Sequence, residues 1–123
     1  MSRPAHDPTP LPQPPVQAEA IRSALAQLAP HLLPQFDRDR ADSTAQARSE
    51  TSATPVRVFA ESWALEVAIL RHPETAARLD ELERRAAEVT DLGEARAVAA
   101  EIGRIRTAAA TEAGLTVANG AAR

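Results

Sequence analysis

The segment "FAESWALEVAIL", residues 59–70, carries large apolar side chains on two sides of a helix instead of one. At about 100° per residue, one arc of a helix over residues 54–71 holds the larger set: Val56, Phe59, Ala60, Trp63, Val67 and Leu70. The nearly opposite arc holds Val58, Leu65 and Ile69. A helix that is apolar on two sides is buried between two layers. The sequence therefore predicts a central helix over residues 54–71, with Trp63 as its core anchor.

Apolar residues spaced three and four apart predict further helices around this central one. A first helix is expected over residues 17–29, and two more over residues 73–89 and 92–113. The last two are joined by a short turn, so they are expected to form an antiparallel hairpin. Asp91 and Glu94 are spaced as a capping box at the start of the final helix.

The second side of the central helix requires a covering surface. The first helix and the cluster of Leu32, Leu33 and Phe36 are expected on its wider face, and the hairpin on its narrower face. A second chain that covers the narrower face is the alternative, because association with another chain adds stability to a thin core. The sequence leaves both possibilities open.

Residues 37–53 form the least regular part of the predicted domain. Alanine and arginine favour a helix in this segment, whereas serine, threonine and aspartate favour turns and caps. It has almost no apolar face, and a helix that is polar all round is either a solvated bridge or unstable. Helix and disorder therefore both remain open here. After this segment, Thr54 and Pro55 are predicted as N-cap and first helical residue.

Chain length and composition indicate the size of the domain, its disordered ends and its location in the cell. The 123 residues suffice for one modest domain, predicted as an all-α bundle of four or five helices over residues 16–113. Six prolines among residues 1–15 predict a disordered arm, and small residues predict a disordered tail over residues 114–123. No apolar run approaches the roughly 20 residues that span a bilayer. We therefore expect a soluble cytoplasmic protein without membrane contact.

No pattern in the sequence indicates catalysis or cofactor binding. The absence of cysteine excludes disulfides, thiolate metal sites and a cysteine nucleophile. His6, His31 and His72 are scattered, so no metal site is predicted. His72 beside Glu74 is interpreted as a helix end and not as an acid–base pair. Glycine-rich phosphate loops and nucleophile motifs are missing. The sequence therefore predicts a protein that is not an enzyme, with no catalytic residue, metal or cofactor.

Charged residues on the last two helices are the predicted partner surface. Acids precede arginines by four residues at Glu74 and Arg78, Asp80 and Arg84, and Glu81 and Arg85, which suits ion pairs within one helix. The exposed rim of the hairpin is expected to bind a protein partner or a second copy through Arg78, Glu81, Arg85, Glu88 and Arg104. Weak nucleic-acid-associated regulation is the alternative, which the interleaved acids and the net charge of −3 oppose.

Three features in order resemble a known group of proteins: a short helix followed by "LPQFD", a long helix centred on tryptophan, and "RHPE" leading into a charged helix. Together they are similar to a family of small uncharacterised helical proteins of high-GC bacteria, over roughly residues 17–88. Some members of that family accompany toxin–antitoxin genes. The resemblance implies a partner-binding or neutralising role. We therefore expect a non-enzymatic protein-interaction module, either an antitoxin-like companion or a self-associating scaffold.

Overall fold

A computed structural model of the chain describes residues 11–115, and these residues are folded almost entirely into helices. The elements are α1 (Ala18–Leu28), the short 3-10 helix η2 (Pro30–Leu32), α2 (Leu33–Glu50), α3 (Thr54–Leu70), α4 (Pro73–Glu88) and α5 (Leu92–Glu112). No strand occurs among the described residues. The predicted all-α bundle with a C-terminal hairpin is confirmed. The disorder predicted for residues 1–10 and 116–123 concerns residues outside the described part of the chain.

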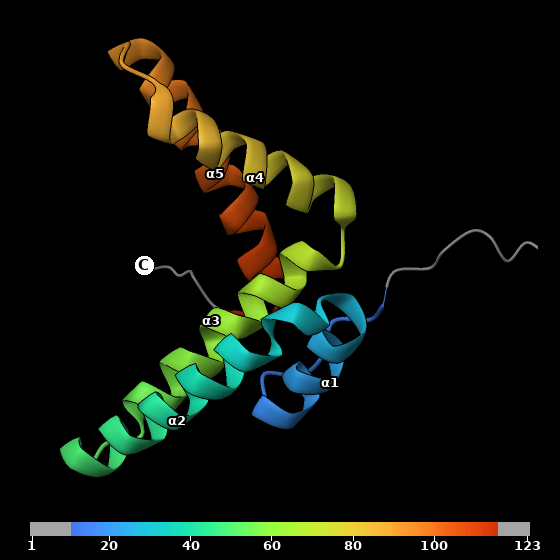
Figure 1. Cartoon of the computed structure of the whole chain (residues 1–123), viewed down its shortest axis with the longest axis vertical. Coiled ribbons are helices and arrows are strands. Elements are labelled where there is room, and N and C mark those ends of the chain that lie inside the picture. Colours follow the sequence, from blue (N-terminus) through green and yellow to red (C-terminus); the bar gives the residue numbers. More distant parts are fainter. Residues whose placement is uncertain (1–10, 116–123) are drawn as a thin grey trace, which may run out of the picture.

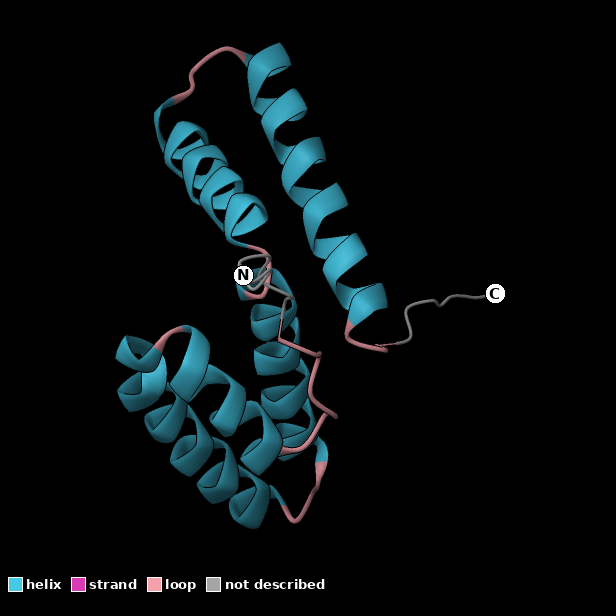
Figure 2. Cartoon of the chain, turned by 90° about the vertical axis from the view of Figure 1, so that its right-hand side faces the viewer, coloured by secondary structure: helices cyan, strands magenta, loops and turns pink. Residues whose placement is uncertain are grey.

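Helix α3 is the central element, as its two apolar sides predict. It contacts α1, α2, α4 and α5. Figure 1 shows α1 and α2 lying along α3, whereas α4 and α5 extend away from its C-terminal end. The same arrangement, seen after a quarter turn, separates a three-helix body from a projecting two-helix hairpin (Figure 2). We refer to α1, α2 and α3 as the body and to α4 and α5 as the hairpin.

An aromatic cluster occupies the centre of the body. The Phe36 side chain is completely buried, and its ring centroid lies 5.1 Å from that of Phe59 and 5.4 Å from that of Trp63. Trp63 is only partly buried, and its Nε1–H donates to Asp39 at 3.1 Å. The expected anchoring role of Trp63 is therefore shared, and Phe36 holds the innermost position.

The two alternatives for residues 37–53 are resolved in favour of a helix up to Glu50, the last residue of α2. Residues 51–53 form the connection to α3, with Thr51 as C-cap residue in the left-handed conformation. The apolar face of α2 is almost absent, as the sequence indicates, and Phe36 is its only buried residue. Polar contacts supplement this single anchor: Asp37 pairs with Arg22 of α1 at 2.8 Å, and Arg40 pairs with Glu19 at 2.8 Å. One buried aromatic ring and a few side-chain pairs thus hold the largely polar α2 against α1 and α3.

The narrower face of α3 is covered over part of its length. Ile69, near the C-terminal end, is buried, and Leu65 is partly buried against the core. Val58, near the N-terminal end, is 54% exposed. The chain itself therefore covers this face near the C-terminal end of α3 and leaves it open near the N-terminal end.

The helix ends differ from the predicted ones in several details. Ala53 is the N-cap residue of α3 instead of Thr54, whose backbone N–H donates to the Ser52 hydroxyl at 3.1 Å. The predicted capping box of α5 is half formed: Asp91 Oδ2 accepts from the Glu94 N–H at 2.8 Å. The Glu94 carboxylate does not return that contact, because it pairs with Arg85.

Both predicted domain boundaries are displaced by contacts with the helices. Gln13 Nε2–H donates to the Ala64 carbonyl at 3.1 Å, and Leu11 packs against the core. Residues 11–15, predicted as part of the arm, therefore contact the helices. At the other end, Gly114 has a φ of 76°, and the Leu115 N–H donates to the Ala110 carbonyl at 2.9 Å. This is a Schellman cap, so the predicted tail begins too early at residue 114.

Candidate functional site

Three of the five predicted partner-binding residues participate in ion pairs within the hairpin. Arg78 binds the Glu101 carboxylate through two hydrogen bonds of 2.8 Å and contacts Glu81 at 3.1 Å. Arg85 pairs with Glu94 at 2.7 Å. The hydrogen bonds from Arg78 lower the pKa of Glu101 below its usual value. These charges therefore join α4 to α5, and a partner would have to compete with them.

The predicted pairs between residues four apart on α4 are wrong. None of the three is an ion pair in the structure. Arg78 and Arg85 pair with acids on α5, and Arg84 has no ion-pair partner within the described residues. A third link of the same kind joins Arg106 of α5 to Glu83 of α4 at 2.8 Å. Three ion pairs therefore connect the facing helices α4 and α5.

Glu88 and Arg104, the other two predicted residues, have no ion-pair partner within residues 11–115. Glu88 lies at the far end of the hairpin, beside Arg85 and Glu94. Arg104 lines a different cleft, near the junction with α3. The five residues therefore do not form one continuous surface, and their role in partner binding stays a prediction.

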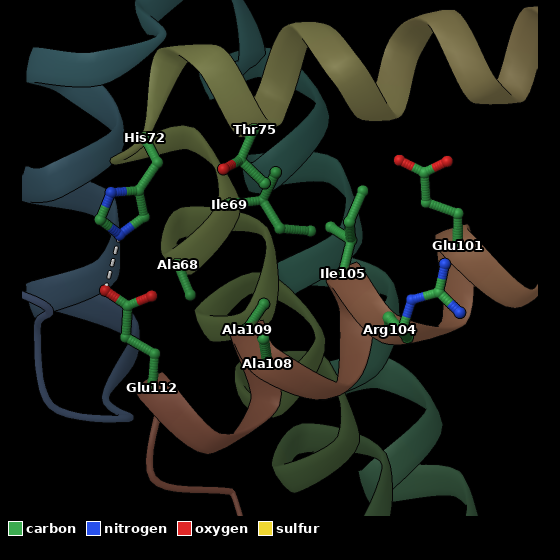
Figure 3. Close-up of a pocket in the computed structure, with 10 residues that line it drawn as sticks. All are labelled: Ala68, Ile69, His72, Thr75, Glu101, Arg104, Ile105, Ala108, Ala109 and Glu112. Carbon is green, nitrogen blue, oxygen red and sulfur yellow. Dashed lines mark hydrogen bonds and ion pairs between the residues drawn. The ribbon is translucent and has the colours of Figure 1, made fainter.

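The cleft beside Arg104 lies where α5 meets the corner between α3 and α4 (Figure 3). It has a volume of about 380 Å³ and an apolar floor that includes Ala68, Ile69, Ile105, Ala108 and Ala109. His72 Nε2 lies 2.8 Å from Glu112 Oε2, and Arg71 pairs with the same carboxylate. His72 therefore meets an acid from the end of α5, not its sequence neighbour Glu74.

The charged side chains in this cleft pair with one another and connect separate helices. Burial opposes the charge of Glu112, but the hydrogen bond with His72 and the charge of Arg71 outweigh that effect and lower its pKa. The Arg71 side chain is only 12% exposed and also donates to the Leu11 carbonyl. One carboxylate thus joins α5 to the α3–α4 corner, while Arg71 holds the N-terminal segment.

A second depression lies at the opposite end of α3 and was not predicted. This groove, with a volume of about 560 Å³, is formed where the start of α1, the middle of α2 and the start of α3 meet. Its apolar lining consists of Val16, Ala18, Ala53, Val56, Phe59 and Ala60. The pattern along α3 assigns Val56 to the core, but Val56 is 41% exposed at the groove edge. Because the lining comes from three separate segments, no local spacing reveals it. We call it the α1–α2–α3 groove.

The charged lining of the α1–α2–α3 groove is basic. Arg40 and Arg57 line it, and no acidic residue does. Arg40 pairs with Glu19 at 2.8 Å, whereas Arg57 has no ion-pair partner within the described residues. Val16, on the other edge, is 37% exposed. Pockets of about 300–1,000 Å³ with apolar walls and few polar groups are typical binding sites, so this groove is the strongest candidate site.

Two further properties limit the chemistry of the described residues. Within residues 11–115, no three histidine, aspartate or glutamate side chains gather where they could hold a metal ion. No helix of that region has the length and apolar character required to cross a membrane. Comparison of the chain with protein families, with curated proteins and with solved structures finds no match.

Proposed function

We propose that this protein is a non-enzymatic protein-interaction module that receives its partner in the α1–α2–α3 groove. The observation that carries the proposal is an open apolar groove edged by two exposed valines, Val16 at 37% and Val56 at 41%. Apolar surface left open between polar residues costs free energy in water, and covering it by a partner recovers that cost. Arg57 adds a cation whose charge no acid of the described chain balances.

The proposed partner is a protein segment with an aliphatic side chain and nearby carboxylates. The aliphatic side chain would fill the groove between Val16 and Val56, and the carboxylates would pair with Arg57 at the edge. An antitoxin-like companion and a self-associating scaffold are both forms of this proposal, in a cytoplasmic setting. The internal ion pairs of Arg78 and Arg85 argue against nucleic-acid binding by the hairpin, because paired arginines release few counterions.

Site-specific cross-linking tests this proposal. A photoreactive side chain at position 56, in the full chain and in the cell that produces it, should give a covalent adduct with a protein. The same group at position 58 is the matched control, because Val58 is 54% exposed on the same helix but does not line the groove. Equal adducts at both positions, or none at position 56, would contradict the proposal.

A further inference from the structure

The end of the hairpin exposes an apolar side chain to solvent. Leu92, at the start of α5, is 63% exposed, the highest value among the large apolar side chains of the described residues. The groove edge is formed by Val16 and Val56, two of the three other large apolar residues that are exposed. We call residues 88–94 the hairpin tip. The hairpin tip thus exposes one large apolar side chain, and the α1–α2–α3 groove is an apolar depression.

The charges of the two places are complementary. The hairpin tip contains Glu88, Asp91 and Glu94 and no basic residue. Glu94 is balanced by Arg85, which leaves Glu88 and Asp91 without an ion-pair partner in the described chain. The groove is lined by Arg40 and Arg57 and by no acid. Arg40 is balanced by Glu19, which leaves Arg57 without an ion-pair partner in the described chain. The exposed Leu92 is thus surrounded by negative charge, and the apolar groove has a positive charge at its edge.

A single molecule cannot bring these two places together in the observed fold. The hairpin tip is the far end of α4 and α5, and the groove lies at the N-terminal end of α3, beside the α2–α3 connection. Figures 1 and 2 show these ends pointing away from each other in both views. Any contact between tip and groove must therefore join two molecules.

We propose that the α1–α2–α3 groove receives the hairpin tip of a second copy of this chain. Leu92 of one copy enters between Val16 and Val56 of the other, while Glu88 and Asp91 face Arg57. This inference rests on the proposed function and identifies the partner as the chain itself. Arg84 and Arg96, which have no ion-pair partner in the described chain, flank the hairpin tip outside residues 88–94, and Arg96 lies one helical turn from Leu92.

The geometry allows two forms of assembly. Each copy carries one tip and one groove, so two copies that exchange tips form a closed dimer with twofold symmetry. One-way docking leaves a tip and a groove open at the ends and produces chains of molecules. Sedimentation velocity of the full chain, from low concentration up to about 1 mM, the weak end of specific association, distinguishes a dimer from a growing series.

Leu92→Ser tests the apolar part of the contact. Full burial of a leucine stabilises a contact enough to change an association constant about ten- to a hundredfold, so the variant should weaken association by a factor of that order. Val58→Ser is the matched control, because Val58 is also exposed but does not line the groove, and it should associate like the parent. Circular dichroism checks that both variants keep their helices.

A charge exchange tests the polar part. Arg57→Glu and Glu88→Arg should each weaken association, and the double variant that carries both should recover it, because the opposite charges again face each other. Arg38→Glu, an exposed change on α2 away from the groove lining, controls for net charge. Recovery in the double variant is not expected from a general effect on folding or solubility.

Three results would overturn the inference: a parent that stays monomeric to about 1 mM, association that survives Leu92→Ser, or a double variant no better than its single changes. The proposed function can still hold if this inference fails. If the cross-linker at position 56 captures a different protein in the cell while the purified chain stays monomeric, the groove binds a partner and only its identity is wrong. If position 56 captures nothing, the proposed function fails as well.

Discussion

The body and the hairpin achieve their stability in different ways. The body is organised around three aromatic rings, with Phe36 completely buried between Phe59 and Trp63. The hairpin contains no aromatic residue, and its buried side chains beyond the junction with α3 are few, chiefly Leu82 and Val98. Ion pairs between α4 and α5 line its flanks. The body thus depends chiefly on a buried aromatic cluster, and the hairpin on a small apolar core with ion pairs at its flanks.

The largest expected effect lies in the body. Phe36→Ala should lower the free energy of unfolding by about 3–5 kcal/mol, because it removes a fully buried ring and leaves a cavity between two others. Chemical denaturation followed by circular dichroism measures this change. Trp63→Phe is the comparison: it keeps an aromatic ring and loses the hydrogen bond to Asp39, so about 1 kcal/mol is expected. A larger cost for Trp63→Phe than for Phe36→Ala would return the anchoring role to Trp63.

Local features of the sequence explain which parts of the fold are predicted well. The hairpin follows from the spacing of apolar residues, the N-cap at Asp91 and a short turn, all of which are local features. The central position of α3 follows from its two apolar sides. These features need no knowledge of the other helices.

Long-range contacts explain what the sequence does not predict. The docking of α2 depends on Phe36 and on pairs such as Arg22 with Asp37, whose partners lie on another helix. The α1–α2–α3 groove is assembled from three segments, and Val56 lies at its edge although helical spacing places it with core residues. Arg78 and Arg85 of α4 also pair with acids on α5 instead of with the acids four residues before them. In each case the partner is set by the tertiary arrangement and not by sequence distance.

A smaller and more local effect is expected in the hairpin. Leu82→Ala should cost about 2–3 kcal/mol, at the lower end of the usual range because the two-helix layer can collapse around a small cavity. Amide hydrogen exchange should accelerate in α4 and in the first half of α5, while α2 keeps its protection. Leu92→Ala, at an exposed position, is the control and should change stability by less than about 0.5 kcal/mol. Equal acceleration across body and hairpin would show that the two regions unfold as one unit.

The junction between body and hairpin should respond to pH. Glu112→Gln removes the charge that holds His72 and Arg71 together, so a cost of about 1 kcal/mol is expected at neutral pH, reduced from the value of a buried pair by partial exposure. Because the pKa of Glu112 is lowered in the folded state, its stabilisation is complete above the ordinary glutamate pKa of about 4.3. It is lost as the pH falls through the lower folded-state pKa.

Urea unfolding of parent and variant over a series of pH values measures this dependence. The stability difference between the two proteins should be constant near neutral pH and shrink as the solution becomes more acidic than about pH 4. Glu74→Gln, which changes the acid next to His72 in sequence, should show no such convergence, because Glu74 does not pair with His72. A difference between parent and Glu112→Gln that persists unchanged into acid would mean that the carboxylate charge does not hold the junction.

The smallest effect is expected on the flank of the hairpin. Arg78→Ala removes the two hydrogen bonds to Glu101, but both side chains are solvent-accessible, and exposed ion pairs contribute little to stability because water and salt screen them. The thermal midpoint should fall less than after Phe36→Ala, Leu82→Ala or Glu112→Gln. The difference between Arg78→Ala and the parent should disappear in about 1 M salt, where the screening length is near 3 Å. Arg84→Ala, a matched change on α4 at an arginine without an ion-pair partner in the described chain, should not show the salt-dependent loss. If Arg78→Ala instead destabilises the hairpin as much as Leu82→Ala and does so at high salt, Arg78 holds α4 to α5 through contacts that salt does not screen. The hairpin would then not depend chiefly on its small apolar core.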